Sequence, residues 1–353
     1  MKIITTIGAG QMASALSFPA VENGNTVRLV GTPLDRDIIN TGKSKGFHPT
    51  LKRQLPENGI EYYQIEDVER ALKGADVVIC GVSSFGIDWF VDNILPIIPE
   101  DIPLLSVTKG MLDMEDGTMI NYPEYFESKL VSNKNLSINA IGGPCTSYEL
   151  ADKDHSLVTF CGENIETLRM LKNIFEAPYY HISLSTDVKG VECAVALKNA
   201  YALGVSLAIG LAIGRDGSGI EHYNSQAGLF GQGVREMKHL LKIAGGGEDN
   251  IVLSAGDLYV TVFGGRTRKI GTLLGRGFSF EEAMEQLKGV TLESIVIATR
   301  TARGVRHMAE RGIVKLEEFP LLLHVDNIIN SGASAADIPW QSFETENFKN
   351  GGK

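Results

Sequence analysis

The chain has 353 residues, a length that predicts two domains. Hydrophobic residues make up 43% of it and charged residues 22%, the balance of an ordinary soluble globular protein. The formal net charge of -10 argues against a general binder of nucleic acid or of anionic membranes, because both partners are themselves negatively charged.

The first thirty residues predict a dinucleotide-binding unit. A β-rich run at 2–6 leads into the turn G-A-G-Q-M-A at 8–13, a helix is expected over 13–23, and 26–30 form a second strand. In such a unit the first glycine permits a tight turn, the second lets the backbone approach a pyrophosphate, and a small residue lets the helix pack closely on the strand. Free N–H groups at the start of the helix favour the anion. The residues assigned to the cofactor in this turn are Gly8, Gly10, Gln11 and Met12.

The ribose end of the cofactor stays open between NAD and NADP. An acidic residue at the end of the second strand favours NAD. Here that strand ends at Val30, and the first acid is Asp35, with Arg36 beside it. Thr32 and Arg36 are able to accept a 2′-phosphate instead. The sequence therefore leans slightly to NADP.

The rest of the first half alternates helices and strands. Buried strands are expected at 75–82, 103–108, 137–141, 157–161 and 179–184, and helices at 66–73, 87–95 and 165–175. This order predicts an α/β Rossmann-type domain over residues 1–186, with a mostly parallel sheet covered on both faces. Such sheets bind ligands at the carboxyl ends of their strands. Ser83 and Lys109 follow two of these strands, so we expect both at the cofactor crevice.

The second half predicts an all-α domain. Helices are expected at 187–213, 220–244, 250–263, 268–275, 280–287, 291–312 and 316–331. This domain would span 187–339 and be followed by a polar, loosely ordered tail at 340–353. Residues 202–213 are apolar but few and interrupted by glycine, which predicts a buried helix and not a membrane span.

Cysteine and histidine usage predicts a cytoplasmic protein without a metal. No C-x-x-C pair occurs among Cys80, Cys145, Cys161 and Cys193, which stand among small or apolar residues, so we expect reduced thiols. The seven histidines show no metal-ligand spacing. The first ten residues run into a strand and a glycine turn, without the form of a signal peptide.

One expected helix carries a lysine in an apolar setting. Lys198 lies between Leu197 and Ala200, in a segment poor in charge. Asp257 lies in a second apolar helix, and a buried carboxylate needs a partner. Lys198 is the best candidate for that partner. To act as a base, a lysine, whose free pKa is about 10.4, needs burial or a second cation nearby, for which Lys109 is the candidate.

A basic turn in the second half predicts an anion site. Gly264-Gly265 precede Arg266-Thr-Arg-Lys269, and a helix is expected to begin at about Thr267. Cations are unfavourable at a helix N-terminus because of the helix dipole. Their presence is explained if an anion such as a phosphate binds among them.

The motifs that carry a resemblance follow one another along nearly the whole chain. They are Gly8-Ala-Gly-Gln-Met-Ala13, Val107-Thr-Lys109-Gly110, Gly142-Gly-Pro144, Gly190-Val-Glu-Cys-Ala-Val-Ala-Leu-Lys198-Asn199, Gly256-Asp257-Leu258 and Gly264-Gly-Arg266-Thr-Arg-Lys269. With this set the chain resembles the soluble NAD(P)-dependent sn-glycerol-3-phosphate dehydrogenase family. The resemblance implies reversible hydride transfer between NAD(P)H and dihydroxyacetone phosphate, a small phosphorylated substrate, and a homodimer.

The resemblance also implies roles for single residues. Lys198 would be the general acid/base on the C2 oxygen, and Lys109, beside Asp257, would polarise the carbonyl. The residues implied to hold the substrate and its phosphate are Asn199, Thr261, Arg266 and Thr267. Glu293 resembles the glutamate that reaches the cofactor.

Several positions depart from the family pattern. Thr267 stands where the family usually has asparagine, and Ser294 where it usually has glycine. Residues 230–233 lack a basic side chain often found there. These departures keep three alternatives open: a dehydrogenase of a four- or five-carbon polyol phosphate, a hydroxy-acid reductase, and a non-catalytic NAD(P) sensor. Retention of both lysines and Asp257 argues against the sensor.

Overall fold

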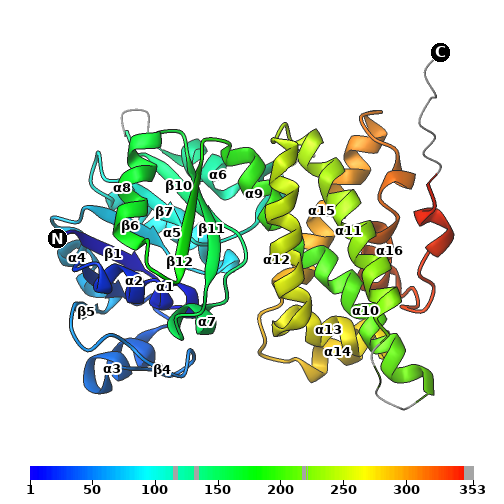
Figure 1. Cartoon of the computed structure of the whole chain (residues 1–353), viewed down its shortest axis with the longest axis horizontal. Coiled ribbons are helices and arrows are strands. Elements are labelled where there is room, and N and C mark those ends of the chain that lie inside the picture. Colours follow the sequence, from blue (N-terminus) through cyan, green and yellow to red (C-terminus); the bar gives the residue numbers. More distant parts are fainter. Residues whose placement is uncertain (114–117, 131–134, 217–219, 221, 346–353) are drawn as a thin grey trace. The chain divides into compact units, whose positions relative to one another are not determined.

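The computed structural model describes residues 1–353 except 114–117, 131–134, 217–219, 221 and 346–353 (Figure 1). The chain forms two compact units. The α/β unit consists of Met1–Leu112, Ile120–Ala196 and Leu241–Val260. The helical unit consists of Asp113–Met119, Leu197–Leu240 and Thr261–Lys353.

The α/β unit is built on an eight-stranded sheet with the strand order β12-β11-β10-β7-β6-β1-β2-β5. Its strands are β1 (Ile3–Ile7), β2 (Thr26–Val30), β5 (Ile60–Tyr63), β6 (Val77–Cys80), β7 (Leu104–Ser106), β10 (Ile138–Gly142), β11 (Ser156–Gly162) and β12 (Tyr180–Ser185). Every neighbouring pair is parallel except β10 and β11. Two short hairpins, β3 (Phe47–His48) with β4 (Arg53–Gln54) and β8 (Met111–Asp113) with β9 (Met119–Asn121), lie outside this sheet. The predicted Rossmann-type fold with a mostly parallel sheet is confirmed.

Alternation along the strands divides the core of this unit in two. On β6, Val77 and Ile79 belong to one cluster of buried residues, and Val78 and Cys80 to the other. The first cluster packs under α2 and α8, and the second under α4 and α5. A strand that is buried on both faces has no polar alternation, which explains its continuous apolar run.

The helices of the α/β unit are mostly short. They are α1 (Gln11–Ala15), α2 (Ser17–Glu22), α3 (Arg36–Lys45), α4 (Val68–Leu72), α5 (Ile87–Asn93), α6 (Tyr122–Lys129), α7 (Ser147–Ala151), α8 (Ile165–Phe175), α9 (Val188–Ala196) and α12 (Ile251–Phe263), the last three residues of which fall in the helical unit. The first predicted helix is divided at Leu16, because Pro19 has no N–H to donate to the preceding turn. All four cysteines are free, and only Cys145 among them is partly exposed.

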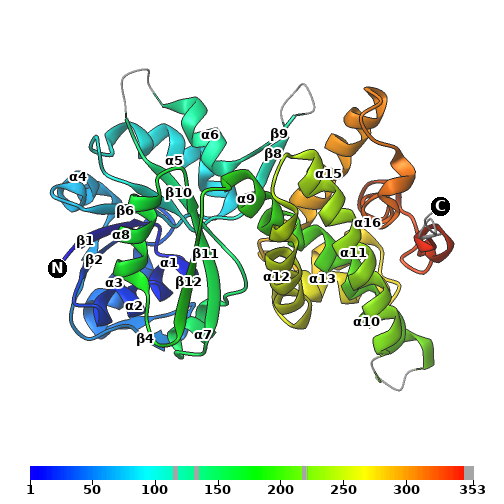
Figure 2. The same ribbon diagram turned by 45° about the horizontal axis from the view of Figure 1, so that its top comes forward.

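The helical unit is organised around α10 (Lys198–Asp216). The remaining helices are α11 (Tyr223–Ile243), α13 (Gly265–Gly275), α14 (Phe280–Gln286), α15 (Glu293–Glu310) and α16 (Pro320–Ser331). Helices α13, α15 and α16 all pack against α10 (Figure 2). The contact with α13 is close, since a Cβ at Gly275 would lie 2.2 Å from the carbonyl oxygen of Leu207. The predicted all-α second half is thus confirmed, although part of its predicted start at 220 falls on residues outside the described ones.

The expected helix at 187–213 is interrupted at Leu197. Helix α9 ends at Ala196 and α10 begins at Lys198, with the Ala200 N–H donating to the Leu197 carbonyl at 3.1 Å in a tightened turn. The stretch Val188–Arg215 is long and apolar enough to cross a membrane, yet 78% of its most apolar window is buried inside the protein, as in a core helix. Burial of residues 202–213 agrees with the prediction from the sequence.

The start of the tail is ordered. Trp340–Phe343 forms a 3-10 turn, and the two end rings pack edge to face with centroids 5.6 Å apart. The Trp340 ring also lies against α11, where a Cβ at Gly228 would be 3.1 Å from it. The prediction of a loosely ordered tail is wrong for these residues, because an aromatic pair gains enough apolar burial to fix them. Residues 346–353 lie outside the described part.

Candidate active site

The glycine turn after β1 is shaped by the neighbouring strand. Gly8 has φ of +100°, and a Cβ there would lie 2.8 Å from the backbone of Gly81. Gly81 in turn admits Ala13, since a Cβ at Gly81 would lie 2.5 Å from the Ala13 Cβ. Gly10 differs, because its φ is an ordinary -67° and the nearest atom to a Cβ would be 3.5 Å away. The protein itself tolerates a side chain at Gly10, so close approach of a ligand is what its absence suits.

Asp35 holds the turn from the side. Its Oδ2 accepts hydrogen bonds from the Ala9 N–H at 3.2 Å, the Thr32 N–H at 2.9 Å and the Thr32 hydroxyl at 2.7 Å. The buried His48 imidazole lies 2.8 Å from the Ala9 carbonyl oxygen, and burial lowers its pKa. The sequence analysis gave neither residue a role here. The acid after β2 therefore braces the backbone of the turn.

Arg36 is engaged on the surface. Its guanidinium forms an ion pair with Glu66, and both side chains are more than half exposed. An exposed pair of this kind contributes about 0–1 kcal/mol. Arg36 therefore exchanges Glu66 for another anion at small cost.

Three neighbouring strands end at the same edge of the sheet. Ile7 of β1 is the register partner of Cys80 on β6, and Cys80 that of Ser106 on β7. The Thr108 hydroxyl donates to the Val82 carbonyl at 2.6 Å and joins the two loops that follow β6 and β7. The predicted residues Gly8, Ser83 and Lys109, which follow these strands, thus belong to one edge. This is the edge at which parallel α/β sheets bind nucleotides, and the glycine turn fits a pyrophosphate there.

Lys109 is paired with Asp257. Its Nζ lies 2.8 Å from Asp257 Oδ2 and donates to the Gly143 carbonyl at 2.7 Å. The Asp257 side chain is 2% exposed and that of Lys109 is 18% exposed. The expectation that this aspartate needs a cation is met by Lys109. The predicted pairing with Lys198, a residue of the helical unit, stays a prediction.

Glu192 is a buried acid that the sequence analysis passed over. It lies on α9, is completely buried, and burial raises its pKa to about 8 against the opposing charge of Lys109. The sequence signal was a glutamate among Val191, Cys193 and Ala194, with no polar neighbour in the helix.

The helical unit carries the remaining candidates near helix starts. Lys198 and Asn199 open α10, Arg266 and Thr267 lie in the first turn of α13, and Glu293 opens α15. Helix α13 begins at Gly265, two residues before the expected start, so its N-terminal turn includes the arginine. Thr261, on the last turn of α12, is the other candidate in this unit.

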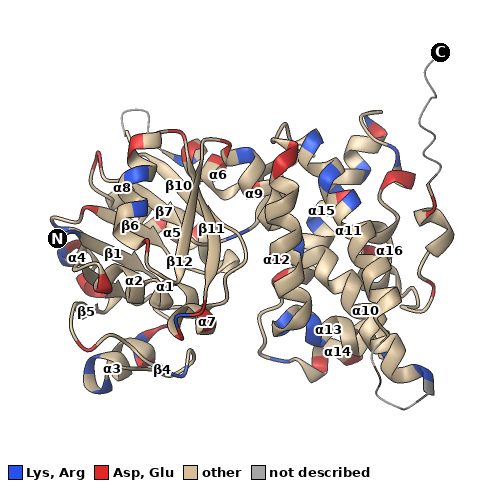
Figure 3. Cartoon of the chain, in the orientation of Figure 1, with Lys and Arg blue, Asp and Glu red and all other residues tan. Residues whose placement is uncertain are grey.

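The N-terminus of α13 has the properties of an anion site. No side chain caps it, and Thr267 is buried in its first turn. Arg266 Nη2 lies 3.6 Å from Glu293 Oε2, which brings two of the predicted residues together. The Arg268 guanidinium reaches back to the Val262 carbonyl at 3.4 Å. Lys and Arg side chains gather over α13 in Figure 3.

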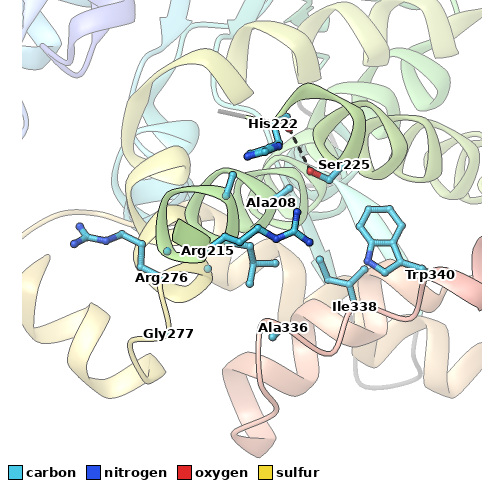
Figure 4. A pocket seen from close by; sticks show the side chains of 13 residues that line it. Ala208, Arg215, His222, Ser225, Arg276, Gly277, Ala336, Ile338 and Trp340 are labelled. Atoms are coloured by element: carbon cyan, nitrogen blue, oxygen red, sulfur yellow. Dashed lines mark hydrogen bonds between the residues drawn. The ribbon is translucent and has the colours of Figure 1, made fainter. Parts of the chain in front are cut away.

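A cavity of about 480 Å³ lies elsewhere in the helical unit. Figure 4 shows Arg215 extended among Ser225, Ile338 and Trp340, which line it. Arg276 extends away from them, and its guanidinium lies 5.7 Å from the Phe278 ring centroid. None of the predicted catalytic, substrate or cofactor residues lines this cavity.

These features define a class. A parallel sheet with a glycine turn, and a buried lysine–carboxylate pair beside it at the carboxyl edge, is the construction of a nicotinamide-dependent oxidoreductase. The sequence model described as NAD-dependent glycerol-3-phosphate dehydrogenase N-terminus matches residues 3–168, and the one described as its C-terminus matches 187–339. The chain belongs to the NAD-dependent glycerol-3-phosphate dehydrogenase family.

Individual relatives agree with this family. The chain is 34% identical over 288 residues to the NADP(+)-dependent glycerol-3-phosphate dehydrogenase of Archaeoglobus fulgidus, covering 81% of this chain and 84% of that one. It is 27% identical to a glycerol-3-phosphate dehydrogenase [NAD(P)+] of Bacillus pumilus, with coverage of 92% and 90%. The fold is also that of glycerol-3-phosphate dehydrogenase from Coxiella burnetii, with a TM-score of 0.79, 22% identity and 97% of each chain covered.

Proposed function

We propose that the protein catalyses reversible hydride transfer between NAD(P)H and dihydroxyacetone phosphate, which yields sn-glycerol 3-phosphate. The observation that carries the proposal is the buried Lys109–Asp257 pair beside the glycine turn, at the ligand-binding edge of the sheet. The printed names of the A. fulgidus and B. pumilus relatives support the substrate and the cofactor.

The bound nicotinamide supplies the hydride, and the chain supplies orientation, charge and a proton. Lys109, fixed by Asp257 and the Gly143 carbonyl, donates to the C2 carbonyl oxygen and stabilises its developing negative charge. Lys198 gives the proton to that oxygen in reduction and removes it in oxidation. These two roles rest on the family resemblance together with the pairing of Lys109.

The substrate phosphate is assigned to the first turn of α13. Arg266 and Thr267 offer a guanidinium and a hydroxyl there, and the uncapped N–H groups add the favourable end of the helix dipole. Asn199 and Thr261 complete the proposed substrate contacts. Glu293 is proposed to reach the cofactor, in which case Arg266 is released from it toward the phosphate.

Both NAD and NADP are proposed as cofactors. Asp35 spends its carboxylate on the turn and on Thr32, so it offers a ribose 2′-hydroxyl less than a free acid would. Arg36 leaves the exposed Glu66 at small cost and then pairs with a 2′-phosphate. We therefore expect NADP to be accepted at least as well as NAD.

A longer polyol phosphate is the second candidate substrate. Thr267 is shorter than the asparagine usual in the family and has a single hydroxyl in place of the amide. Its side chain is buried, so the lost volume is not replaced by solvent motion at that position. A four- or five-carbon ketose phosphate is the substrate that such room would favour.

The proposed organisation follows the sequence prediction. Residues 1–186 bind the dinucleotide, 187–339 bind the substrate and provide the surface of a homodimer, and 340–353 form a tail. The protein would act in the cytoplasm. Light scattering coupled to gel filtration measures the oligomeric state, and a monomeric mass at assay concentration contradicts the dimer.

The test combines a substrate panel with one substitution. Steady-state reduction is measured with NADH and NADPH against dihydroxyacetone phosphate and its four- and five-carbon homologues. Lys198→Met should lower kcat by about 10²–10⁴-fold and leave NAD(P)H affinity unchanged in a fluorescence titration. Lys189→Met is the matched control, since Lys189 is exposed on α9 and paired with Glu124.

Two results decide against the proposal. Turnover that survives Lys198→Met within about tenfold rejects this lysine as the proton donor. Negligible turnover of dihydroxyacetone phosphate, together with reduction of a longer ketose phosphate, replaces the first substrate with the second.

A further inference from the structure

Glu192 is a carboxyl group that the structure leaves without a hydrogen bond. The side chain is completely buried on α9, and neither of its oxygens has a partner among the residues that the structure describes. Asp257 is nearly as buried but has Lys109 at 2.8 Å. An ionised carboxylate without a partner is too costly to bury, so Glu192 keeps its proton at neutral pH.

Helix α9 carries Glu192 to the backbone that holds Lys109. A Cβ at Gly142 would lie 2.6 Å from a Val191 methyl, which shows that α9 is packed directly onto the end of β10. The next residue, Gly143, accepts the hydrogen bond from Lys109 Nζ at 2.7 Å. The charge of Lys109 is accordingly the influence that opposes burial at Glu192.

The other ionisable groups around α9 do not compensate the acid. Burial raises the pKa of the Cys161 thiol on β11 and of the Cys193 thiol on α9, so both are neutral. Asp187 accepts from the Gly190 N–H at 2.8 Å and also from Gly247 and Asn250. The remaining acids on elements that contact α9 are Glu124 of α6, which pairs with Lys189, and Glu248 and Asp249 of the turn before α12. Strand β10 has no ionisable side chain.

We propose that Glu192 is a positioning residue that keeps the Lys109–Asp257 pair electrically neutral: its protonated form permits reduction, and its ionisation at alkaline pH slows it. With Glu192 protonated, Lys109 and Asp257 sum to zero charge. With Glu192 ionised, the group carries one negative charge. That charge competes for the lysine ammonium and repels both a phosphorylated substrate and the oxyanion that forms at C2.

The inference rests on the proposed function, because it gives Lys109 the role of polarising the carbonyl. It differs from that function in assigning the alkaline limit of the reaction to one buried acid. The group involved touches neither substrate nor cofactor in this assignment and acts through Lys109.

The decisive variant is Glu192→Gln, which keeps the shape and fixes the neutral state. For the wild type we expect kcat for reduction to fall about tenfold as the pH rises through about 8. In Glu192→Gln the neutral-pH value should stay within about threefold of wild type, and the alkaline decline should move up by about one pH unit or more. Glu236→Gln is the control, because Glu236 is a buried acid of the helical unit and should leave this decline in place.

An infrared titration separates this inference from the proposed function. The cofactor-free wild type should show a C=O stretching band of a protonated carboxyl that is lost above a pH of about 8 and is absent in Glu192→Gln. An unchanged alkaline limb in Glu192→Gln overturns the assignment, as does absence of the band from the wild type at neutral pH. If no ketose phosphate is reduced, the proposed function fails while the band can still titrate as described.

Discussion

Replacing Lys109 and Asp257 one at a time and together should separate what this pair does for stability from what it does for activity. Lys109→Met leaves a carboxylate whose side chain is only 2% exposed, so we expect the free energy of unfolding to fall by about 3–5 kcal/mol. Asp257→Leu leaves an ammonium with 18% exposure and a hydrogen bond to Gly143, so the loss should be about 1–2 kcal/mol.

The double variant should be close to wild type in stability. Methionine and leucine have nearly the volume of the side chains they replace, and an apolar pair carries no desolvation cost. Replacements of buried ion pairs by apolar residues are neutral or stabilising by about 1–4 kcal/mol. The two single losses sum to about 4–7 kcal/mol, which makes the expected coupling energy at least about 4 kcal/mol.

The assay is urea unfolding of the four proteins at one pH, with reduction of dihydroxyacetone phosphate measured alongside. All three variants should be inactive, the double variant included. A double variant as unstable as the sum of the singles would falsify the reasoning, because the two side chains would then stabilise the fold independently. A double variant that is active would remove the pair from the mechanism.

Two further predictions concern the helical unit. Burial raises the pKa of Glu236 to about 7, above the value of 4.5 in the unfolded chain; its contribution to stability is therefore complete below the lower value and lost as pH rises through the upper one. The loss amounts to about 3 kcal/mol at roughly 1.4 kcal/mol per pKa unit, and thermal unfolding across that range should be flatter in Glu236→Gln; an equal slope in both proteins refutes it. Gly271→Ala should raise KM for the phosphorylated substrate about tenfold, because its Cβ would lie 2.5 Å from the Ser206 Cβ and push α13, with Arg266, away from α10. The control is Gly231→Ala, whose Cβ would meet no atom within 4 Å, and an equal KM in the two variants contradicts the prediction.

Much of the sheet follows from local sequence pattern. Strand β2 and helix α8 have the predicted bounds, because each is closed by an unambiguous signal: Asn-Gly-Asn precedes β2, and Asn164 caps α8. Strand β5 was not predicted. It lies at the edge of the sheet, and its residues Ile60–Tyr63 are only partly buried, so it lacks the continuous apolar run of the central strands. The antiparallel direction of β11 is equally invisible in a run of apolar residues.

The break between α9 and α10 could not be predicted for a related reason. Residues 190–200 have helix-compatible spacing throughout, with neither proline nor glycine near Leu197. A helix interrupted without such a residue is shaped by its tertiary packing. The structure nevertheless places the interruption directly before Lys198, the residue that the sequence had marked.

The candidate site shows where reasoning from single residues stops. The rule that a buried carboxylate needs a cation correctly required a partner for Asp257, but two lysines satisfied it, and only the fold shows that Lys109 is in contact. Asp35 was considered as a ribose ligand, whereas it turns inward to three donors of the turn. A side chain with several local donors within reach is decided by geometry that the sequence does not contain.

Three buried acids of this chain are accommodated in different ways, and the differences point to function. Glu236 accepts hydrogen bonds from the N–H groups of Leu321 and Leu322 at the start of α16, at 2.8 and 3.0 Å, so it joins two helices. Asp257 forms an ion pair that an apolar pair could replace without loss of stability. Glu192 forms no hydrogen bond at all. Stability alone gives no reason to retain the last two, and both lie where they act on the charge of Lys109. Groups that weaken the fold and converge on one ammonium are retained because the reaction requires the charge they set.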